Sequence, residues 1–345
     1  MISTLQQVKA AMSDSDTRGE PGNAVRTSTF TRPDGHNITY HTVGSAQHPL
    51  MLFVVGSSGL GILYHRLALA LSTRFQCVYY DKRGFLPADT AEAVVASQTD
   101  RLILAKDNAD DAAALVERIS PKRPAYVFGT STGGTAVLDL TVRFPDIVHT
   151  AVLHEPITFS VVPLSEMKDE VLALYRNLFF FDDQVQGYRV FADYMFRPHS
   201  QATSSALRKS LRRLQRRDAP GSNSLETLTM PSRTSTSAQA FNARQGEQEA
   251  AAMLAYKLDV EAARSVRGKL LLVRGSESRD WPVSQAVEAL ARVLGENQKV
   301  WELIGDHLSF AGQRRVATFA EQLVGLLLFR EDDGLVAGKE RKSRL

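Results

Sequence analysis

A serine between two glycines is the residue of this sequence best suited to covalent chemistry. The segment Gly129-Thr130-Ser131-Thr132-Gly133 follows an aromatic and β-branched run, and a helix-like segment, 135–144, comes directly after it. In Gly-x-Ser-x-Gly the serine occupies a tight turn between a strand and a helix, and glycine is needed where a Cβ would clash with neighbouring backbone. Such a turn raises the hydroxyl above the sheet and directs the N–H of Thr132, at the start of the helix, toward an oxyanion. The spacing predicts Ser131 as a nucleophile.

A serine hydroxyl is a weak nucleophile until a base removes its proton, and His307 is the candidate base. The sequence holds eight histidines. In a strand–turn–helix architecture of this kind the base comes last, in the loop after the final strand, and only His307 lies there. Gly305 lets the chain turn sharply before it, whereas His154 lies at the end of an earlier strand and is expected to pack.

The acid that would orient His307 has two main candidates. Glu155 ends the strand after the elbow helix, 24 positions beyond Ser131. Asp280 follows the next-to-last strand, where the acid of such a triad is more often found, and Glu277 in the same loop is a third choice. The ends of parallel strands open onto one edge of the sheet, so geometry alone leaves the choice open.

The second oxyanion donor is expected in the loop Gly56-Ser57-Ser58-Gly59, after the first parallel strand. Ser57 is the favoured donor and Ser58 the alternative. The same loop with Gly61 and Asp81 loosely resembles a dinucleotide fingerprint. Its spacing is Gly-x-x-Gly-x-Gly rather than Gly-x-Gly-x-x-Gly, which makes an NAD-type enzyme the weaker interpretation.

The elements around these residues alternate between strands and helices after an initial hairpin. Two antiparallel strands followed by repeated strand–helix units predict an α/β fold with a mostly parallel central sheet covered on both faces. The predicted strands are 25–31, 37–43, 50–55, 76–80, 126–129, 147–153, 269–273 and 299–304, and the predicted helices are 63–73, 99–119, 135–144, 282–294 and 317–328.

Residues 157–267 break this alternation and predict an inserted helical cap. Its helical candidates are 166–180, 184–195, 204–216 and 238–263, with a serine- and threonine-rich link over 222–237. The predicted division is therefore an arm (1–24), a core (25–156 and 268–330), the cap (157–267) and a tail (331–345).

Side chains of the cap suggest what it binds. Its phenylalanines and tyrosines suit a hydrophobic acyl group, although packing within the cap would account for most of them. Six basic residues over 208–217 indicate either a solvated helix face or a docking face for an anionic group, such as the phosphates of a CoA ester.

Length and composition agree with one globular unit of the size of an enzyme, built as one large domain or two small ones. The chain has 345 residues, of which 43% are hydrophobic and 23% charged, and a net charge of +3 is too small to indicate nucleic acid. The one cysteine, Cys77, lies in an apolar run and predicts a buried strand residue of an intracellular protein, without a disulfide or thiolate metal site. No apolar stretch approaches 18 residues, so no membrane span is expected.

The sequence closes on Ser343-Arg344-Leu345, a close variant of the Ser-Lys-Leu peroxisomal address. Basic residues precede it over 339–342. The tripeptide predicts recognition by a peroxisomal import receptor, with a cytoplasmic location as the alternative.

Taken together, these motifs resemble the α/β-hydrolase superfamily over residues 25–330. The resemblance is carried by the elbow, the corner Tyr80-Asp81-Lys82-Arg83-Gly84, the late loop Gly305-Asp306-His307 and the inserted cap. More narrowly, Leu153-His154-Glu155-Pro156 after Gly-x-Ser-x-Gly resembles the zearalenone lactonases and a set of small microbial hydrolases. In that lactonase group the glutamate serves as the acid, which favours Glu155 over Asp280.

The resemblance implies a serine hydrolase that cleaves a carboxylic ester, thioester or lactone through an acyl-enzyme, with no metal or organic cofactor. A serine at the elbow argues against the epoxide-hydrolase and dehalogenase branches, which use aspartate there. With the peroxisomal ending, the chain resembles fungal hydrolases of secondary-metabolite or toxin pathways. The alternatives are a lyase, cyclase or isomerase that uses the same oxyanion hole, and a receptor that keeps the pocket.

Overall fold

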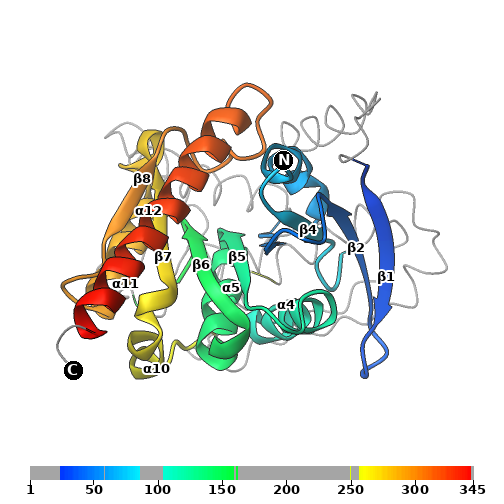
Figure 1. Ribbon diagram of the computed structural model, residues 1–345, viewed down its shortest axis with the longest axis horizontal. Coiled ribbons are helices and arrows are strands. Elements are labelled where there is room, and N and C mark those ends of the chain that lie inside the picture. Colours follow the sequence, from blue (N-terminus) through cyan, green and yellow to red (C-terminus); the bar gives the residue numbers. More distant parts are fainter. Residues whose placement is uncertain are drawn as a thin grey trace, which may run out of the picture.

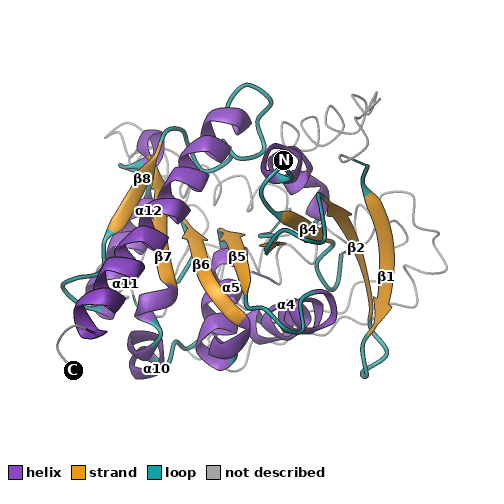
Figure 2. Ribbon diagram, viewed as in Figure 1, coloured by secondary structure: helices purple, strands orange, loops and turns teal. Residues whose placement is uncertain are grey.

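The fold is an eight-stranded sheet with helices on both faces (Figures 1 and 2). The computed structural model describes residues 24–57, 59–85, 104–158, 161, 249 and 256–342, with side chains up to Arg330 except Pro282. The predicted arm, most of the cap and the terminal tripeptide lie outside these residues. The basic run over 208–217 and Ser58 lie outside them too.

The sheet has the strand order β1-β2-β4-β3-β5-β6-β7-β8. The first three strands of this order pair antiparallel, and every later pair is parallel. This confirms the predicted fold class. The strands are β1 (Arg26–Thr31), β2 (Asn37–Val43), β3 (Leu50–Val54), β4 (Gln76–Tyr80), β5 (Ala125–Thr130), β6 (Val148–His154), β7 (Leu270–Gly275) and β8 (Val300–Leu303).

The inner parallel strands β3 and β5 are buried along their whole length, with side chains covered on both faces, which explains why their sequences are largely apolar. Alternate residues of β3 show the division: Leu50 and Leu52 belong to one apolar cluster, and Met51 and Phe53 to the other. The first cluster lies under α4 (Ala105–Ile119), α5 (Thr132–Arg143), α10 (Val260–Ser265) and α11 (Pro282–Leu294). The second lies under α2 (His65–Leu71) and α12 (Val316–Lys342), which pack against each other.

The order of the strands brings the candidate chemistry to one edge. After β3 the chain moves outward to β4 and then returns to place β5 on the other side of β3. The loops that follow β3 and β5 therefore diverge at a switch point, where α/β sheets bind their ligands. The elbow follows β5, and the loop with Ser57 follows β3.

Two glycines set how closely the elbow approaches the sheet. A Cβ on Gly133 would lie 2.2 Å from the carbonyl oxygen of Val54, and one on Gly129 would lie 2.4 Å from the carbonyl oxygen of Gly133. Both obstacles are backbone atoms that a rotamer change cannot move. The spacing of the motif is therefore a steric requirement, as the sequence predicts.

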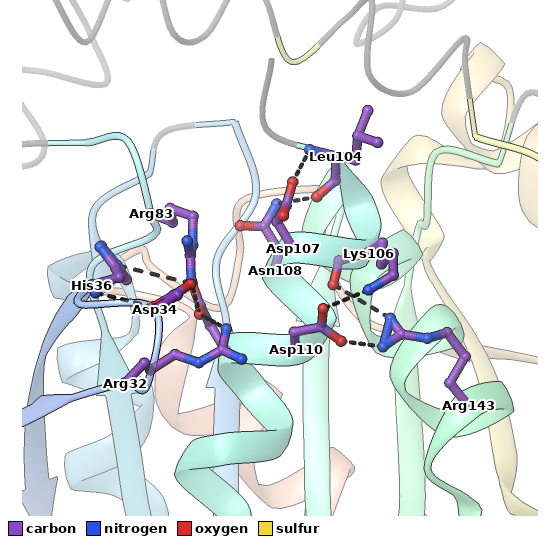
Figure 3. Close-up of polar contacts among 11 residues, drawn as sticks. Arg32, Asp34, His36, Arg83, Leu104, Lys106, Asp107, Asn108, Asp110 and Arg143 are labelled. Atoms are coloured by element: carbon purple, nitrogen blue, oxygen red, sulfur yellow. Dashed lines mark hydrogen bonds and ion pairs between the residues drawn. The ribbon is translucent and has the colours of Figure 1, made fainter. Parts of the chain in front are cut away.

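The corner after β4 is fixed by ion pairs on the outer side of the sheet. Arg83 donates from Nε to Asp111 Oδ2 at 2.9 Å and from a second nitrogen to Asp34 at 2.9 Å (Figure 3). Asp111 lies on α4, is 1% exposed and also accepts from Arg32 at 2.5 Å. The corner, the hairpin and α4 are thus held together by one buried carboxylate.

Several helix boundaries differ from the prediction: α4, for example, begins at Ala105 instead of 99, and Leu104 before it is extended. Residues 256–259 are not helical, and α10 begins anew because the Asp259 side chain accepts from the N–H of Ala262 at 3.0 Å, which is an N-cap. The last helix continues to Lys342 instead of ending at 328. No proline interrupts it, and its final residues include Glu, Lys and Arg, which favour helices. Much of the predicted tail is therefore helical.

Within the described part of the chain, no helix is long and apolar enough to cross a membrane.

Substituting two glycines tests the steric requirement. Gly133→Ala should lower the free energy of unfolding by about 3 kcal/mol or more, because its Cβ meets fixed backbone. Gly325→Ala is the matched control: it lies in α12 with open space around its Cβ position, and should raise stability by about 0.5–1 kcal/mol. Urea unfolding of both variants measures this. A Gly133→Ala protein as stable as the parent would contradict the packing described for the elbow.

Candidate active site

Ser131 stands on a strained turn between β5 and α5. Its φ is 60° and its ψ is −129°, and it is 7% exposed. Its N–H donates to the carbonyl of His154 at 3.1 Å, and its own carbonyl accepts from Ile157 at 3.2 Å. A non-glycine residue in such a conformation costs about 1–3 kcal/mol and persists only where surrounding structure enforces it, which is typical of active sites.

His307 is oriented by Glu155. Nδ1 of the imidazole lies 2.7 Å from Oε2 of Glu155, and both side chains are buried. A carboxylate accepts a hydrogen bond only from a protonated nitrogen, so Nδ1 carries the proton and Nε2 is the basic nitrogen of the neutral ring. This is the tautomer that a general base acting on serine requires.

Glu155 is held as an anion by a set of donors on its other oxygen. Oε1 accepts from the N–H of Gly275 at 2.9 Å, from Ser284 Oγ at 3.2 Å, and from Ser278 Oγ. Burial alone would raise the pKa of this carboxyl, but the hydrogen bond from His307, and the charge of that ring when it is protonated, outweigh burial and lower the pKa to about 2. The side chain is therefore ionised at neutral pH.

The competing acids lie elsewhere. The side chain of Asp280 is exposed, and Glu277 pairs with Arg315 at 2.6 Å on the surface. The alternative prediction placed the acid, Asp280, in the loop after β7. That loop instead supplies Ser278 as a donor to Glu155, together with Gly275 at the end of β7. Sequence reasoning missed this role, although the run Gly275-Ser276-Glu277-Ser278 of small polar residues after a strand was visible.

His154 packs beneath the site, as predicted. Its ring is fully buried and stacks on His307 with centroids 6.0 Å apart, while its Nδ1 lies 3.3 Å from Thr130 Oγ1. Phe310 and Phe319 meet its edge. Burial lowers the pKa of His154 to about 4, so the ring is neutral under His307. Because the carbonyl of His154 also receives the Ser131 N–H, this residue links the serine and histidine loops.

The loop after β3 lies against the elbow. A Cβ on Gly56 would lie 3.2 Å from Cβ of Ser131, and Ser57 Oγ is 3.5 Å from Thr132 Oγ1. Thr132 is the first residue of α5, where N–H groups have no partner within the helix. Ser57 and Thr132 are thus brought together next to Ser131. The carboxylate of Asp81 accepts a hydrogen bond from the N–H of Gly61 at 2.9 Å and so holds this loop. In a dinucleotide site the acid would instead bind the ribose of the ligand.

One pair of residues at the site was not foreseen from the sequence. Lys82 and Glu249 form a buried ion pair beside Thr132. Lys82 belongs to the corner Tyr80-Asp81-Lys82-Arg83-Gly84, but no feature of the sequence links it to Glu249. Among the described residues, no group of three His, Cys, Asp or Glu side chains could hold a metal ion.

With this geometry established, comparison with known proteins decides the family. Residues 49–309 match the family described as alpha/beta hydrolase fold. The chain belongs to this family. It is also 28% identical over 297 residues to the uncharacterized hydrolase YraK of Bacillus subtilis strain 168, covering 85% of this chain and 93% of that protein. The protein is therefore a hydrolase-type α/β enzyme.

Solved structures share the fold at low identity. A bacterial membrane phospholipase A, described as a virulence factor, aligns with a TM-score of 0.57 and 18% identity over 96% of this chain and 94% of that one. The carboxylesterase CesB (YbfK) of Bacillus subtilis aligns with a TM-score of 0.55 and 13% identity over 94% of this chain and 97% of that one. At these identities the likeness establishes the architecture alone.

The two candidate acids can be separated by labelling Ser131 with a fluorophosphonate. Glu155→Gln should slow labelling by about 100-fold or more, because His307 loses the charge that fixes its tautomer and stabilises its protonated form. Asp280→Asn, the matched control on an exposed side chain, should stay within about threefold of the parent. Slow labelling after the Asp280 change, with the Glu155 variant unaffected, would reverse the assignment.

His154 should give the protein an acid sensitivity. The unfolded chain takes up a proton at this residue below its ordinary pKa of 6.5, whereas the folded protein does so only near 4, so stability falls as pH decreases between these values. From pH 7 to pH 5 the loss should be about 2 kcal/mol. Urea unfolding at both pH values should show that His154→Phe loses about 2 kcal/mol less stability between pH 7 and pH 5 than the parent protein does. Equal losses in the two proteins would contradict it.

Proposed function

We propose that the protein is a serine hydrolase that cleaves a carboxylic ester, thioester or lactone through an acyl-enzyme. The observation that carries the proposal is the buried bond between His307 Nδ1 and Glu155, which follows directly on His154, the residue whose carbonyl accepts the N–H of the strained Ser131. In the described part of the chain, Ser131 and Glu155 are the two non-glycine residues with positive φ. Strain at both residues supports a functional rather than a structural role.

The reaction would proceed in two halves. Oγ of Ser131 attacks the carbonyl carbon while Nε2 of His307 takes the serine proton, and the N–H groups of Ser57 and Thr132 hold the resulting oxyanion. The imidazolium gives its proton to the leaving oxygen or sulfur as that bond breaks. Water then attacks the acyl-enzyme with His307 again as base, and the proton returns to Ser131. Glu155 stabilises the imidazolium in both halves.

The substrate we propose is a hydrophobic acyl compound. Support comes from the aromatic side chains of the predicted cap. A role in a fungal secondary-metabolite or toxin pathway rests on the sequence resemblance only. The lyase or cyclase and the receptor are the competing functions, and both predict that no acyl group is found on Ser131 in the experiment below.

Activity profiling tests the proposal. The purified protein is assayed with nitrophenyl esters of increasing chain length, acyl-CoA thioesters and lactones, and mass spectrometry is used to find an acyl group on Ser131. Ser131→Ala should abolish the adduct and lower turnover at least about 1,000-fold. Ser265→Ala, an exposed serine on α10, is the matched control and should leave both unchanged. A folded protein that neither forms the adduct nor turns over any class would support the receptor or lyase instead.

The proposal includes a peroxisomal location, which depends on Ser343, Arg344 and Leu345 alone. A fluorescent protein fused before the complete chain should give a punctate distribution that coincides with a peroxisomal marker. Deleting the tripeptide should disperse it. A distribution that does not change on deletion would refute this part of the proposal.

A further inference from the structure

Lys82 places a buried amino group at the corner after β4. Its side chain is 3% exposed. Its backbone N–H donates to the carbonyl of Gly59 at 2.7 Å, and its backbone carbonyl accepts from the N–H of Phe85 at 3.0 Å. The next residue, Arg83, is clamped to α4 and to the hairpin (Figure 3). Burial lowers the pKa of Lys82 to about 7. A charge in such a place requires a partner, since an unpaired buried ion is strongly unfavourable.

The partner is Glu249, which lies in the long insertion between β6 and α10. Its side chain is 5% exposed, and its Oε1 both pairs with Lys82 Nζ and accepts a hydrogen bond from Thr132 Oγ1 at 2.6 Å. Thr132 Oγ1 in turn lies 3.5 Å from Ser57 Oγ. One carboxylate oxygen therefore joins a core lysine to the side chain of the residue that follows the nucleophile.

This chain of contacts ends on the two residues whose N–H groups form the oxyanion hole. A donor N–H stabilises an oxyanion most when it is held in place before the charge develops. The hydrogen bond that fixes the Thr132 side chain also restricts the backbone of Thr132, and so holds its N–H in place. The same carboxylate would repel a developing oxyanion if its charge were not balanced. Lys82 supplies that balance at contact distance, where the attraction between opposite charges is strongest.

We propose that Glu249 and Lys82 are positioning residues for the oxyanion hole. Glu249 fixes Thr132 through its hydroxyl, and Lys82 neutralises Glu249 so that the hole stays receptive to negative charge. The inference rests on the proposed function and deepens it. It also gives Glu249, a residue of the long stretch of sequence between β6 and α10, a role beside the nucleophile.

Four variants separate the charge effect from the hydrogen-bond effect. Lys82→Met leaves the Glu249 carboxylate unbalanced beside the hole and should lower kcat about 10- to 100-fold, with KM changed less than about threefold. Adding Glu249→Gln removes the charge but keeps an acceptor for Thr132, and should restore kcat to within about threefold of the parent. Adding Glu249→Leu instead removes the acceptor as well, and should leave kcat about 10-fold low. Lys106→Met, an exposed lysine paired with Asp110 on α4, is the matched control and should change neither constant.

The readouts are kcat and KM on the best ester found and the rate of fluorophosphonate labelling. Equal kcat in the two double variants, or a Lys82→Met defect that Glu249→Gln does not relieve, would overturn the inference. If Lys82→Met alone does not fold, the comparison of the two uncharged double variants still decides the role of the Thr132 bond. A parent protein that neither labels nor turns over esters refutes the proposed function, whereas an active parent with unaffected variants refutes this inference only.

Discussion

The site depends on one buried carboxylate that is kept ionised. Transferring an anion such as Glu155 out of water is unfavourable unless hydrogen bonds and an opposite charge replace the lost hydration. Gly275, Ser278 and Ser284 provide the hydrogen bonds on one oxygen, and His307 occupies the other. Gly275 is the last residue of β7, the two serines lie in the elements that follow β7, and His307 lies in the loop after β8, so the carboxylate can be satisfied only after the parallel sheet has assembled.

Backbone strain at the site follows from the same requirement. Ser131 and Glu155 each occupy a left-handed conformation at the end of adjacent strands, β5 and β6. The N–H of Ser131 binds the carbonyl of His154, and the N–H of Glu155 binds the carbonyl of Val273. These bonds turn both side chains out of the sheet at its carboxyl edge. Gly133 lets the elbow approach β3, and Gly129 lets the start of α5 approach β5.

Much of this arrangement follows from local sequence. The elbow, the hairpin and the position of His307 could be predicted because tight turns restrict residue type and because parallel strands need apolar runs. The acid could not be settled from the residues, since Glu155 and Asp280 both follow strands that open on the same edge. What decides between them is which carboxylate receives donors, and Ser278 and Ser284 are revealed as donors only by the packing of η5 (Ser276–Ser278) and α11. The pair Lys82–Glu249 could not be predicted either, because its partners are far apart in the sequence and no motif links them.

The central claim is that Glu155, and no other carboxylate, holds the Nδ1 proton of His307. Proton NMR at low temperature measures this directly, because a proton shared in a short bond between imidazole and a buried carboxylate resonates far downfield and exchanges slowly. The structure predicts such a resonance in the parent protein, its retention in Asp280→Asn and its loss in Glu155→Gln. A downfield resonance that survives in a folded Glu155→Gln protein, or disappears in Asp280→Asn, would contradict the account.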